Sequence, residues 1–171
     1  MKHTTRFTLI GSALACGAGF SGSAIAGGIS LYEIATPDVG LASAGYSARA
    51  QDASTLLKNP AGMSELQGSQ LQGGLQVLYG DVKFSPDSNT SVRLGTDDGG
   101  NAIGWLPGMS LFYVHDLGEK WRVGFGMFSN FGLAQKYDGN WIGRYYVQES
   151  TLIGISLMPS VSYQVNDWLS V

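Results

Sequence analysis

The sequence has few of the residues that most often carry catalysis and metal binding. It holds one cysteine, Cys16, and two histidines, His3 and His115, and the first two of these three lie in a segment that we expect to be removed. What is left excludes a disulfide framework, a zinc site of cysteine and histidine ligands and a cysteine nucleophile. A serine-hydrolase triad would have to use His115, which an ordinary strand position near a turn explains as well. We therefore expect no catalytic residue, no metal and no cofactor.

Basic residues and long apolar stretches are also scarce. The formal net charge is −3, from 10 Lys and Arg against 13 Asp and Glu. Loss of two basic residues with the N-terminal segment gives 8 − 13 = −5, which argues against a nucleic-acid partner. No apolar run of about 18 residues follows that segment, so the sequence predicts no transmembrane helix. Residence in a membrane would have to depend on strands.

The N-terminus has the pattern of a secretory signal peptide. An apolar run at residues 7–20 follows two basic residues, and Ala24-Ile25-Ala26 supplies a small-x-small cleavage site. We expect residues 1–26 to be the signal peptide. A lipoprotein box at Ala13-Leu14-Ala15-Cys16 is the alternative, although its first alanine is a poor substitute for the aliphatic residue wanted there.

Residues 27–68 lack strand alternation and are rich in small side chains. Within them, residues 52–58 predict a short helix that Asp52 or Ser54 caps and that Pro60 ends at Asn59. We therefore expect this region to form short helices and turns.

Alternation of apolar with polar or small residues begins near Leu71 and predicts antiparallel strands. A second strand, expected at residues 108–117, alternates poorly because Phe112 and Val114 lie on the parity opposite to its other apolar residues. A fourth strand is the clearest, and a fifth opens at residues 168–171. The third strand breaks its alternation at Phe128 and Ser129, and its expected apolar face holds Trp121, Val123, Phe125, Met127 and Phe131.

Long loops, at residues 86–107 and about 133–149, alternate with short turns. This asymmetry is typical of an outer-membrane barrel with long extracellular loops and short periplasmic turns. Each complete strand has the ~10 residues that a tilted span needs. Aromatic residues near the expected strand ends suit the two membrane interfaces: Tyr79, Trp121, Tyr163 and Trp168.

The sequence thus predicts an all-β fold, an antiparallel transmembrane β-barrel in the outer membrane of a Gram-negative bacterium. An open sheet in lipid leaves its two edge strands unpaired. Because only four to five strands are expected here, in residues 69–171, we expect the chain to be the first part of a longer barrel.

Several runs of residues resemble one known family, the FadL/TodX outer-membrane transporters. Asp52-Ala53-Ser54 with Asn59-Pro60-Ala61-Gly62-Met63 is similar to the family's N-terminal hatch. Ser129-Asn130-Phe131-Gly132-Leu133 resembles its third strand. The runs that follow agree in order: Trp141-Ile142-Gly143-Arg144-Tyr145, Pro159-Ser160-Val161 and Val165-Asn166-Asp167-Trp168-Leu169-Ser170-Val171.

The resemblance implies a 14-stranded barrel whose lumen is plugged by a partly helical hatch, here residues 27–68. It implies passive uptake of long-chain fatty acids or other hydrophobic compounds, which leave sideways into the membrane, and no catalysis. The implied partners are a hydrophobic small molecule and outer-membrane lipid, with no obligate protein partner evident. The implied hatch gate is Asn59, Pro60 and Ala61, and the implied kink with its lateral opening is Ser129, Asn130, Phe131 and Gly132.

Three alternatives stay open at this stage. Asn59-Pro60 is also an ordinary helix stop. The pattern of strands and loops fits a structural or adhesive barrel without transport equally well, and a secreted soluble β-domain with hydrolase activity would need His115. Within the transporter hypothesis, the second long loop offers apolar residues where ligand could first bind: Trp141, Ile142, Tyr145 and Tyr146.

Overall fold

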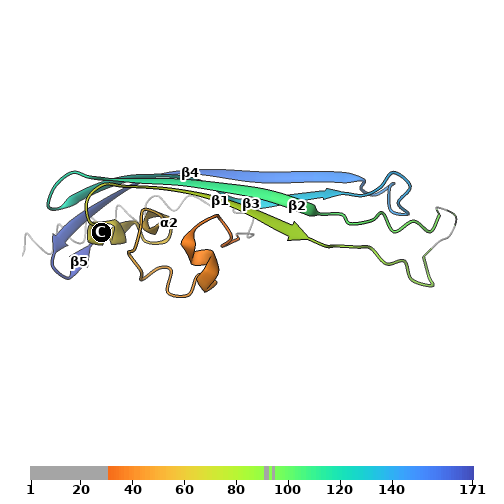
Figure 1. Ribbon diagram of the computed structural model, residues 1–171, viewed down its shortest axis with the longest axis horizontal. Helices are drawn as coiled ribbons and strands as arrows, with labels where there is room; N and C mark the ends of the chain where they lie inside the picture. The colour runs from red at the N-terminus through yellow and green to blue at the C-terminus, as the bar shows by residue number, and fades with distance from the viewer. Residues whose placement is uncertain (1–30, 91–92, 94) are drawn as a thin grey trace, which may run out of the picture.

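The computed structural model describes residues 31–90, 93 and 95–171, so the expected signal peptide lies outside the described residues. Five strands form one antiparallel meander in the order β1-β2-β3-β4-β5, drawn in Figure 1. Each of the first four strands has enough residues to cross a bilayer at a tilt. The strands are β1 (Gln70–Gly80), β2 (Gly104–Asp116), β3 (Trp121–Lys136), β4 (Glu149–Asn166) and β5 (Leu169–Ser170).

Residues 31–68, called the hatch segment below, lie against one face of the sheet (Figure 1). They contain two 3-10 helices and one short α-helix, which are η1 (Pro37–Leu41), η2 (Pro60–Glu65) and α2 (Thr55–Lys58). The carboxylate of Asp52 accepts hydrogen bonds from the backbone N–H and the hydroxyl of Ser54, which fixes the turn into α2. As expected, the helix ends before Pro60. No helix in the described part of the chain is long and apolar enough to span a membrane.

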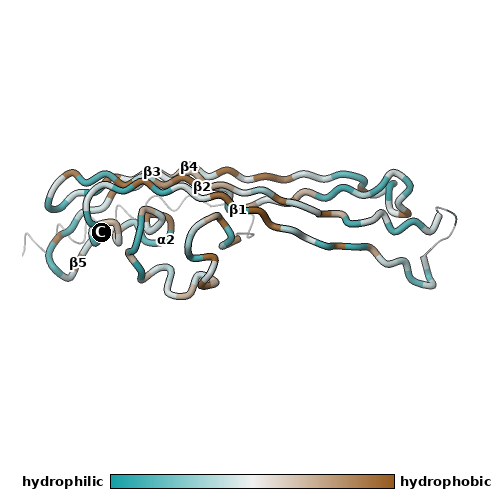
Figure 2. The backbone as a smooth tube through the Cα atoms, viewed as in Figure 1, coloured by the Kyte–Doolittle hydropathy of each residue, from teal (hydrophilic) through white to brown (hydrophobic). Residues whose placement is uncertain are grey.

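The strands divide their side chains between an inner face, which contacts the hatch segment, and an outer face. The outer face carries large apolar side chains without protein cover, such as Leu75, 84% exposed, and Ile155, 70% exposed. Figure 2 shows hydrophobic residues along the middle of the strands and hydrophilic residues towards both ends. An apolar band of this kind on the outer face is what contact with lipid requires.

Aromatic pairs lie on the outer face near both ends of the strands. Tyr79 and Trp105 have ring centroids 4.8 Å apart next to the first long loop. Trp121 and Tyr163 are 4.6 Å apart at the end with the short turns. Amphipathic rings in two such rows suit the two membrane–water interfaces.

The hatch segment explains why β2 alternates poorly. Phe112 and Val114 are fully buried on the inner face, where they belong to one apolar cluster with Leu56 and Met63 of the hatch segment. Lipid on one face and the hatch on the other both call for apolar residues, so the pattern of β2 is apolar on both parities. The strand also starts at Gly104 rather than at Gly108 as expected.

Two inner-face glycines of β3 make room for the hatch. A Cβ atom at Gly124 would lie 2.8 Å from the Met63 sulfur, and one at Gly126 would lie 3.1 Å from Leu56 Cδ1. Both distances are shorter than side chains tolerate without a shift. The small residues on the inner parity of β3 therefore form a groove that receives α2 and η2.

Candidate functional site

The strand β3 contains a β-bulge in its second half. Its register against β4 passes from Phe128 opposite Ser156 to Phe131 opposite Gly154, so β3 has one residue more than β4 at this point. One extra residue exchanges the two faces for everything that follows. The expectation that Phe131 shares a face with Trp121 is therefore wrong, because Phe131 pairs with the inner-face residue Gly154.

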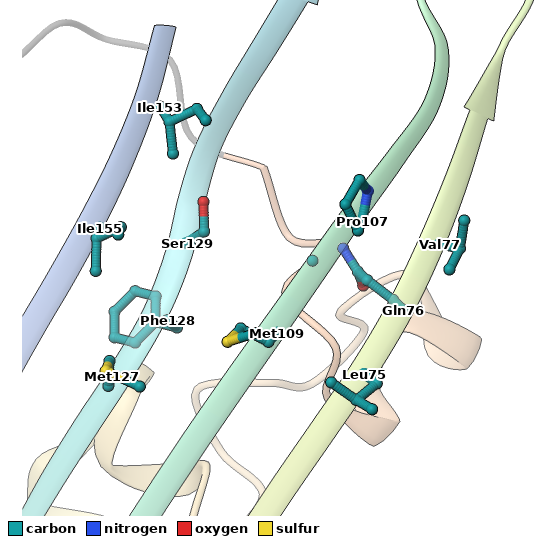
Figure 3. Close-up of a pocket in the computed structure, with 11 residues that line it drawn as sticks. Leu75, Gln76, Val77, Pro107, Met109, Met127, Phe128, Ser129, Ile153 and Ile155 are labelled. Atoms are coloured by element: carbon teal, nitrogen blue, oxygen red, sulfur yellow. The ribbon is translucent and has the colours of Figure 1, made fainter.

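The hydrogen-bonded ladder between β2 and β3 ends at the same level. It runs from Asp116 opposite Arg122 to Ser110 opposite Phe128. Beyond this point, within the described residues, β2 pairs only with β1 and β3 pairs only with β4. Figure 3 shows the two strands drawing apart there. The wall of the sheet thus has a side opening, bordered by residues 104–109 of β2 and 129–136 of β3.

Cavities lie on both sides of the opening. An apolar groove of about 470 Å³ on the outer side is lined by residues of all four long strands, as seen in Figure 3. A cavity of about 260 Å³ on the inner side is lined in part by Leu31 and Glu33 of the hatch segment. The two share the following residues in their walls: Gln76, Pro107, Gly108, Ser129 and Ile153. Groove and cavity therefore adjoin at the opening; the two together are called the passage, with the groove as its outer mouth and the cavity as its inner mouth.

The lining of this passage is apolar and nearly free of charge. Glu33 is the only ionisable side chain among the described residues that line either mouth. Its Oε2 atom is buried and has no hydrogen-bond partner in the described part of the chain. Such walls suit a hydrocarbon group and offer no cation to an anionic one.

Residues 31–36 of the hatch segment cross the inner mouth. On one side, Ala35 accepts a hydrogen bond through its carbonyl from the Ser110 hydroxyl at 3.0 Å, and its N–H donates to Gln76 Oε1 at 2.6 Å. On the other side, the Leu31 N–H donates to the carbonyl of Asn130 in the bulge at 2.9 Å. The segment is thus hydrogen-bonded to β1 and β2 on one side of the opening and to β3 on the other.

Comparison with known proteins decides the family. Residues 17–171 match the family described as outer membrane protein transport protein (OMPP1/FadL/TodX). The chain belongs to this family. It is 29% identical over 163 residues to outer membrane protein P1 of Haemophilus influenzae, covering 88% of this chain and 36% of that protein. The match to the 47 kDa outer membrane protein of Pasteurella multocida is 32% over 158 residues, covering 91% and 35%.

Two further FadL-family relatives agree. The long-chain fatty acid transport protein of Escherichia coli K12 is 27% identical over 167 residues, covering 98% of this chain and 36% of the relative. A crystal structure of a Pseudomonas aeruginosa FadL homologue superposes with a TM-score of 0.57 at 25% identity, covering 74% of this chain and 32% of the other. The chain spans about a third of the length of these relatives. The prediction of an outer-membrane β-barrel protein of a Gram-negative bacterium is confirmed.

The residues expected to form the FadL-type kink lie at the opening. Ser129 borders both mouths of the passage and Gly132 borders the inner one. The Ser129 hydroxyl donates to the Phe131 carbonyl at 3.2 Å, and the Asn130 carboxamide oxygen accepts from the Ser156 hydroxyl at 3.1 Å. These bonds stabilise the bulged backbone. The role of the four residues in ligand release stays a prediction.

The residues expected to form the hatch gate lie elsewhere. Asn59 and Ala61 line a cavity near β5, next to Trp168 and Ser170, and neither borders the passage. The Asn59 side-chain amide donates to the Ser47 carbonyl at 3.0 Å. The structure thus does not bring Asn59, Pro60 and Ala61 together with the bulge, and their gating role stays a prediction.

The apolar residues of the second long loop fall into two groups. Trp141 and Ile142 are each only 6% exposed, and the Trp141 ring stacks on Tyr137 with centroids 3.7 Å apart. The backbone N–H of Ile142 also donates to the carbonyl of Asp97 at 3.1 Å, which joins the two long loops. Tyr145 and Tyr146 are 74% and 93% exposed. Of these four residues, only the two tyrosines are exposed, and a role in first contact with ligand stays a prediction.

Sequence reasoning missed the inner-mouth residues Glu33, Ala35 and Gln76. The inner-face parity of Gln76 could be read from the alternation of β1, which marks a polar side chain pointing at the hatch. Its neighbours in the hatch segment carry no strand or helix pattern. Nothing in the sequence could have paired them with Gln76, because the contact joins residues 41 and 43 positions apart.

His115 does not have the surroundings of a hydrolase histidine. Its Nδ1 lies 3.1 Å from the Ser69 hydroxyl and 3.0 Å from the Tyr113 hydroxyl, on the exposed side of β2. Within the described residues, no carboxylate hydrogen bonds the ring to orient it as a general base requires. The named relatives are outer-membrane and transport proteins, which agrees with a protein that is not an enzyme.

Proposed function

We propose that the full-length protein lets hydrophobic compounds, long-chain fatty acids or hydrocarbons, diffuse inward across the outer membrane and releases them sideways between β2 and β3. The observation that carries this proposal is the interrupted β2–β3 ladder with an apolar mouth on each side. The relative named for long-chain fatty acid transport supports the ligand class.

A sideways release has a clear energetic reason. An alkyl chain that leaves an apolar cavity for water loses ~0.8 kcal/mol for each CH₂ exposed. The outer groove is bounded by side chains such as Leu75, Met109 and Ile155, which belong to the lipid-facing band. A ligand that passes the opening therefore moves from one apolar environment to another, and no energy input is needed.

The hatch segment makes the passage conditional. It covers the inner mouth with residues 31–36 and rests on β3 through α2 and η2. The proposal keeps the hatch gate at Asn59, Pro60 and Ala61 that the family resemblance implies. Asn59→Ala would remove the bond to Ser47, which we expect to loosen residues 45–62 and to change the uptake rate. An uptake rate equal to wild type, with loosening confirmed by hydrogen exchange, would remove the gating role from this residue.

The proposal is tested by uptake of radiolabelled palmitate in cells that carry or lack the gene for the full-length protein. Outer-membrane fractions must contain equal amounts of protein in the complemented strains. Loss of uptake on deletion, restored by the gene, supports transport of fatty acid. If deletion changes uptake neither of palmitate nor of a radiolabelled alkane, the protein is not a transporter of this class.

A structural or adhesive barrel is the second candidate. The observation in its favour is the loop that carries Tyr145 and Tyr146, because it is braced by buried Trp141 and presents two exposed rings outward. Exposed aromatic residues on a rigid support are common in protein contacts. Adhesion that depends on both tyrosines, in cells whose uptake is unaffected by gene deletion, would favour this candidate.

A further inference from the structure

One side chain of β1 binds the hatch backbone through both ends of its amide. Gln76 Oε1 accepts a hydrogen bond from the Ala35 N–H at 2.6 Å, and its Nε2 donates to the Glu33 carbonyl. The Gln76 amide is planar and carries both a donor and an acceptor. It therefore pairs with the backbone of Glu33 and Ala35 in the way that the backbone of a neighbouring strand would. Neither an apolar residue nor a carboxylate at this position could make both bonds.

The backbone around Gln76 is shaped to permit this contact. A Cβ atom at Gly108, its partner on β2, would lie 3.0 Å from Gln76 Cγ and from Nε2. A Cβ at Gly74 would lie 1.7 Å from the Ala35 carbonyl oxygen. Glycine at both positions lets the Gln76 side chain cross β2 and lets the hatch backbone approach the sheet. Figure 3 shows the side chain reaching from β1 towards Pro107 on β2.

The contact lies at the side opening itself. Gln76 lines both the outer groove and the inner cavity, and the peptide that it binds covers the inner mouth. On the other side of the opening, the corresponding contact is the hydrogen bond from the Leu31 N–H to the carbonyl of Asn130 in β3. Among the described hatch residues, only Leu31 and Glu33 line the inner mouth, so movement of residues 31–36 away from β1 and β2 would uncover it on that side.

The bound state also contains an unfavourable element. The backbone carbonyl of Glu33 accepts a hydrogen bond from Gln76, but one of its carboxylate oxygens is buried and has no partner among the described residues. Burial of an unpaired polar group opposes the contact, and hydration on release would relieve it. The buried oxygen therefore reduces the free-energy difference between the bound and the released state, which two hydrogen bonds alone would make larger.

We propose that Gln76 is the latch of the passage: its amide holds residues 31–36 over the inner mouth, and release of these two hydrogen bonds opens the way between β2 and β3. Gln76 acts as a positioning residue that need not touch the ligand. The expected effect of Gln76 on uptake rests on the proposed function, whereas its role in holding residues 31–36 in place is independent of that function.

The latch is tested first without any ligand. Amide hydrogen exchange is measured on the full-length protein in detergent micelles for wild type, Gln76→Leu and Gln72→Leu. Gln72 is a matched control, because it lies on the same face of β1 and accepts a hydrogen bond from the hatch N–H of Ser54 at 3.0 Å, but borders neither mouth. We expect amide exchange at residues 31–36 to be about tenfold faster in Gln76→Leu than in wild type, and unchanged in Gln72→Leu. Unchanged exchange there would overturn the latch.

The same variants are then compared in palmitate uptake. Gln76→Leu is expected to raise the initial rate severalfold at saturating palmitate with the half-saturating concentration unchanged, whereas Gln72→Leu stays at the wild-type rate. Gln76→Glu keeps the acceptor for Ala35 but not the donor for Glu33, so it serves as a second latch variant if Gln76→Leu inserts poorly. Faster exchange with a wild-type uptake rate would show that residues 31–36 do not close the passage.

A cross-link gives the opposite perturbation. Ala35→Cys with Ser110→Cys, in a background whose other cysteines are replaced, is joined by a short thiol-specific cross-linker. The expected result is loss of palmitate uptake that cleavage of the linker restores. Full uptake with the link intact would contradict the latch. Absence of uptake in wild type would reject the proposed function, and the exchange experiment would still decide whether Gln76 holds the hatch.

Discussion

Ser110 and Phe128 form the last residue pair of the β2–β3 ladder, and both side chains are buried on the inner face. The Phe128 ring stacks on Phe112 with centroids 5.7 Å apart, which anchors β3 to the apolar cluster beneath the hatch. The Ser110 hydroxyl holds the carbonyl of Ala35. The pair therefore marks the level at which the closed wall, packed on the hatch, gives way to the side opening.

The close approach of the hatch to β1 predicts different effects for two adjacent glycines. Gly74→Ala would place a methyl group within 1.7 Å of the Ala35 carbonyl oxygen, whereas a Cβ at Gly73 meets nothing closer than 3.8 Å. We expect Gly74→Ala to displace residues 31–36 at a cost of about 1–3 kcal/mol and Gly73→Ala to be neutral. Limited proteolysis of the hatch in the folded, detergent-solubilised protein measures the difference. Equal protection in both variants would show that the approach is not constrained.

The packing of α2 on β3 predicts that Leu56 is the main anchor of the hatch. Its side chain is fully buried against Gly124 and Gly126. Leu56→Ala should lower the free energy of unfolding by about 2–5 kcal/mol, measured by urea denaturation in micelles. Leu71→Ala, on the lipid-facing side of β1, is the comparison and should change it far less. A small effect at Leu56 would mean that the hatch contributes little to the folded state.

The lone carboxylate at the inner mouth predicts a charge preference. Glu33→Gln removes the ionisable group from the passage while it keeps the shape of the side chain. The uptake of palmitate, an anion, should rise about fivefold relative to that of a radiolabelled alkane, the factor that roughly 1 kcal/mol of charge repulsion gives. The uptake of the alkane itself, which carries no charge, should not rise, because loss of the buried carboxylate favours the latched state. An equal rise for both probes would point to loosening of the hatch instead.

The hatch also contains a tyrosine whose ionisation is coupled to folding. Burial, reinforced by the neighbouring Asp38 carboxylate, raises the pKa of Tyr46 from 10.0 to about 12. A raised folded-state pKa means that the neutral phenol stabilises the fold below pH 10 and that this contribution is lost as pH rises from 10 through 12. We expect the free energy of unfolding to fall more steeply in wild type than in Tyr46→Phe over the pH range of about 9 to 11.5, which covers the rise towards the folded-state pKa. Tyr32→Phe, at a more exposed position, is the control and should behave as wild type.

The positions of the strands, and which side chains point to which face, could be predicted from the sequence wherever each face of a strand has a single kind of neighbour. Lipid on one side and small or polar residues on the other produced regular alternation in β1 and β4, and both were found. β2 alternated poorly because the hatch covers Phe112 and Val114, a contact with residues far away in the sequence. The break at Phe128 and Ser129 indicated an irregularity, but not that a bulge would turn Phe131 inward.

The candidate site was predicted less well than the fold. Ser129 and Gly132 could be marked by family resemblance, and they border the passage. Gln76 and Ala35 could not be identified from the sequence. Their contact forms only in the folded protein, where β1, a strand with regular alternation, meets residues 31–36, which have no helix or strand periodicity. Sequence patterns record what each strand faces on average, whereas this passage depends on a single side-chain amide and on two missing Cβ atoms.

Removal of the bulge tests the central claim most directly. Deletion of Asn130 takes away the extra residue of β3, so that β3 keeps register with β4 and can continue its ladder with β2 beyond Ser110. Asn130→Ala keeps the chain length and is the matched control. With equal amounts of each protein in the outer membrane, palmitate uptake should be lost in the deletion variant and retained in Asn130→Ala. Wild-type uptake in the deletion variant, with a continuous β2–β3 ladder confirmed by its structure, would contradict release through this opening.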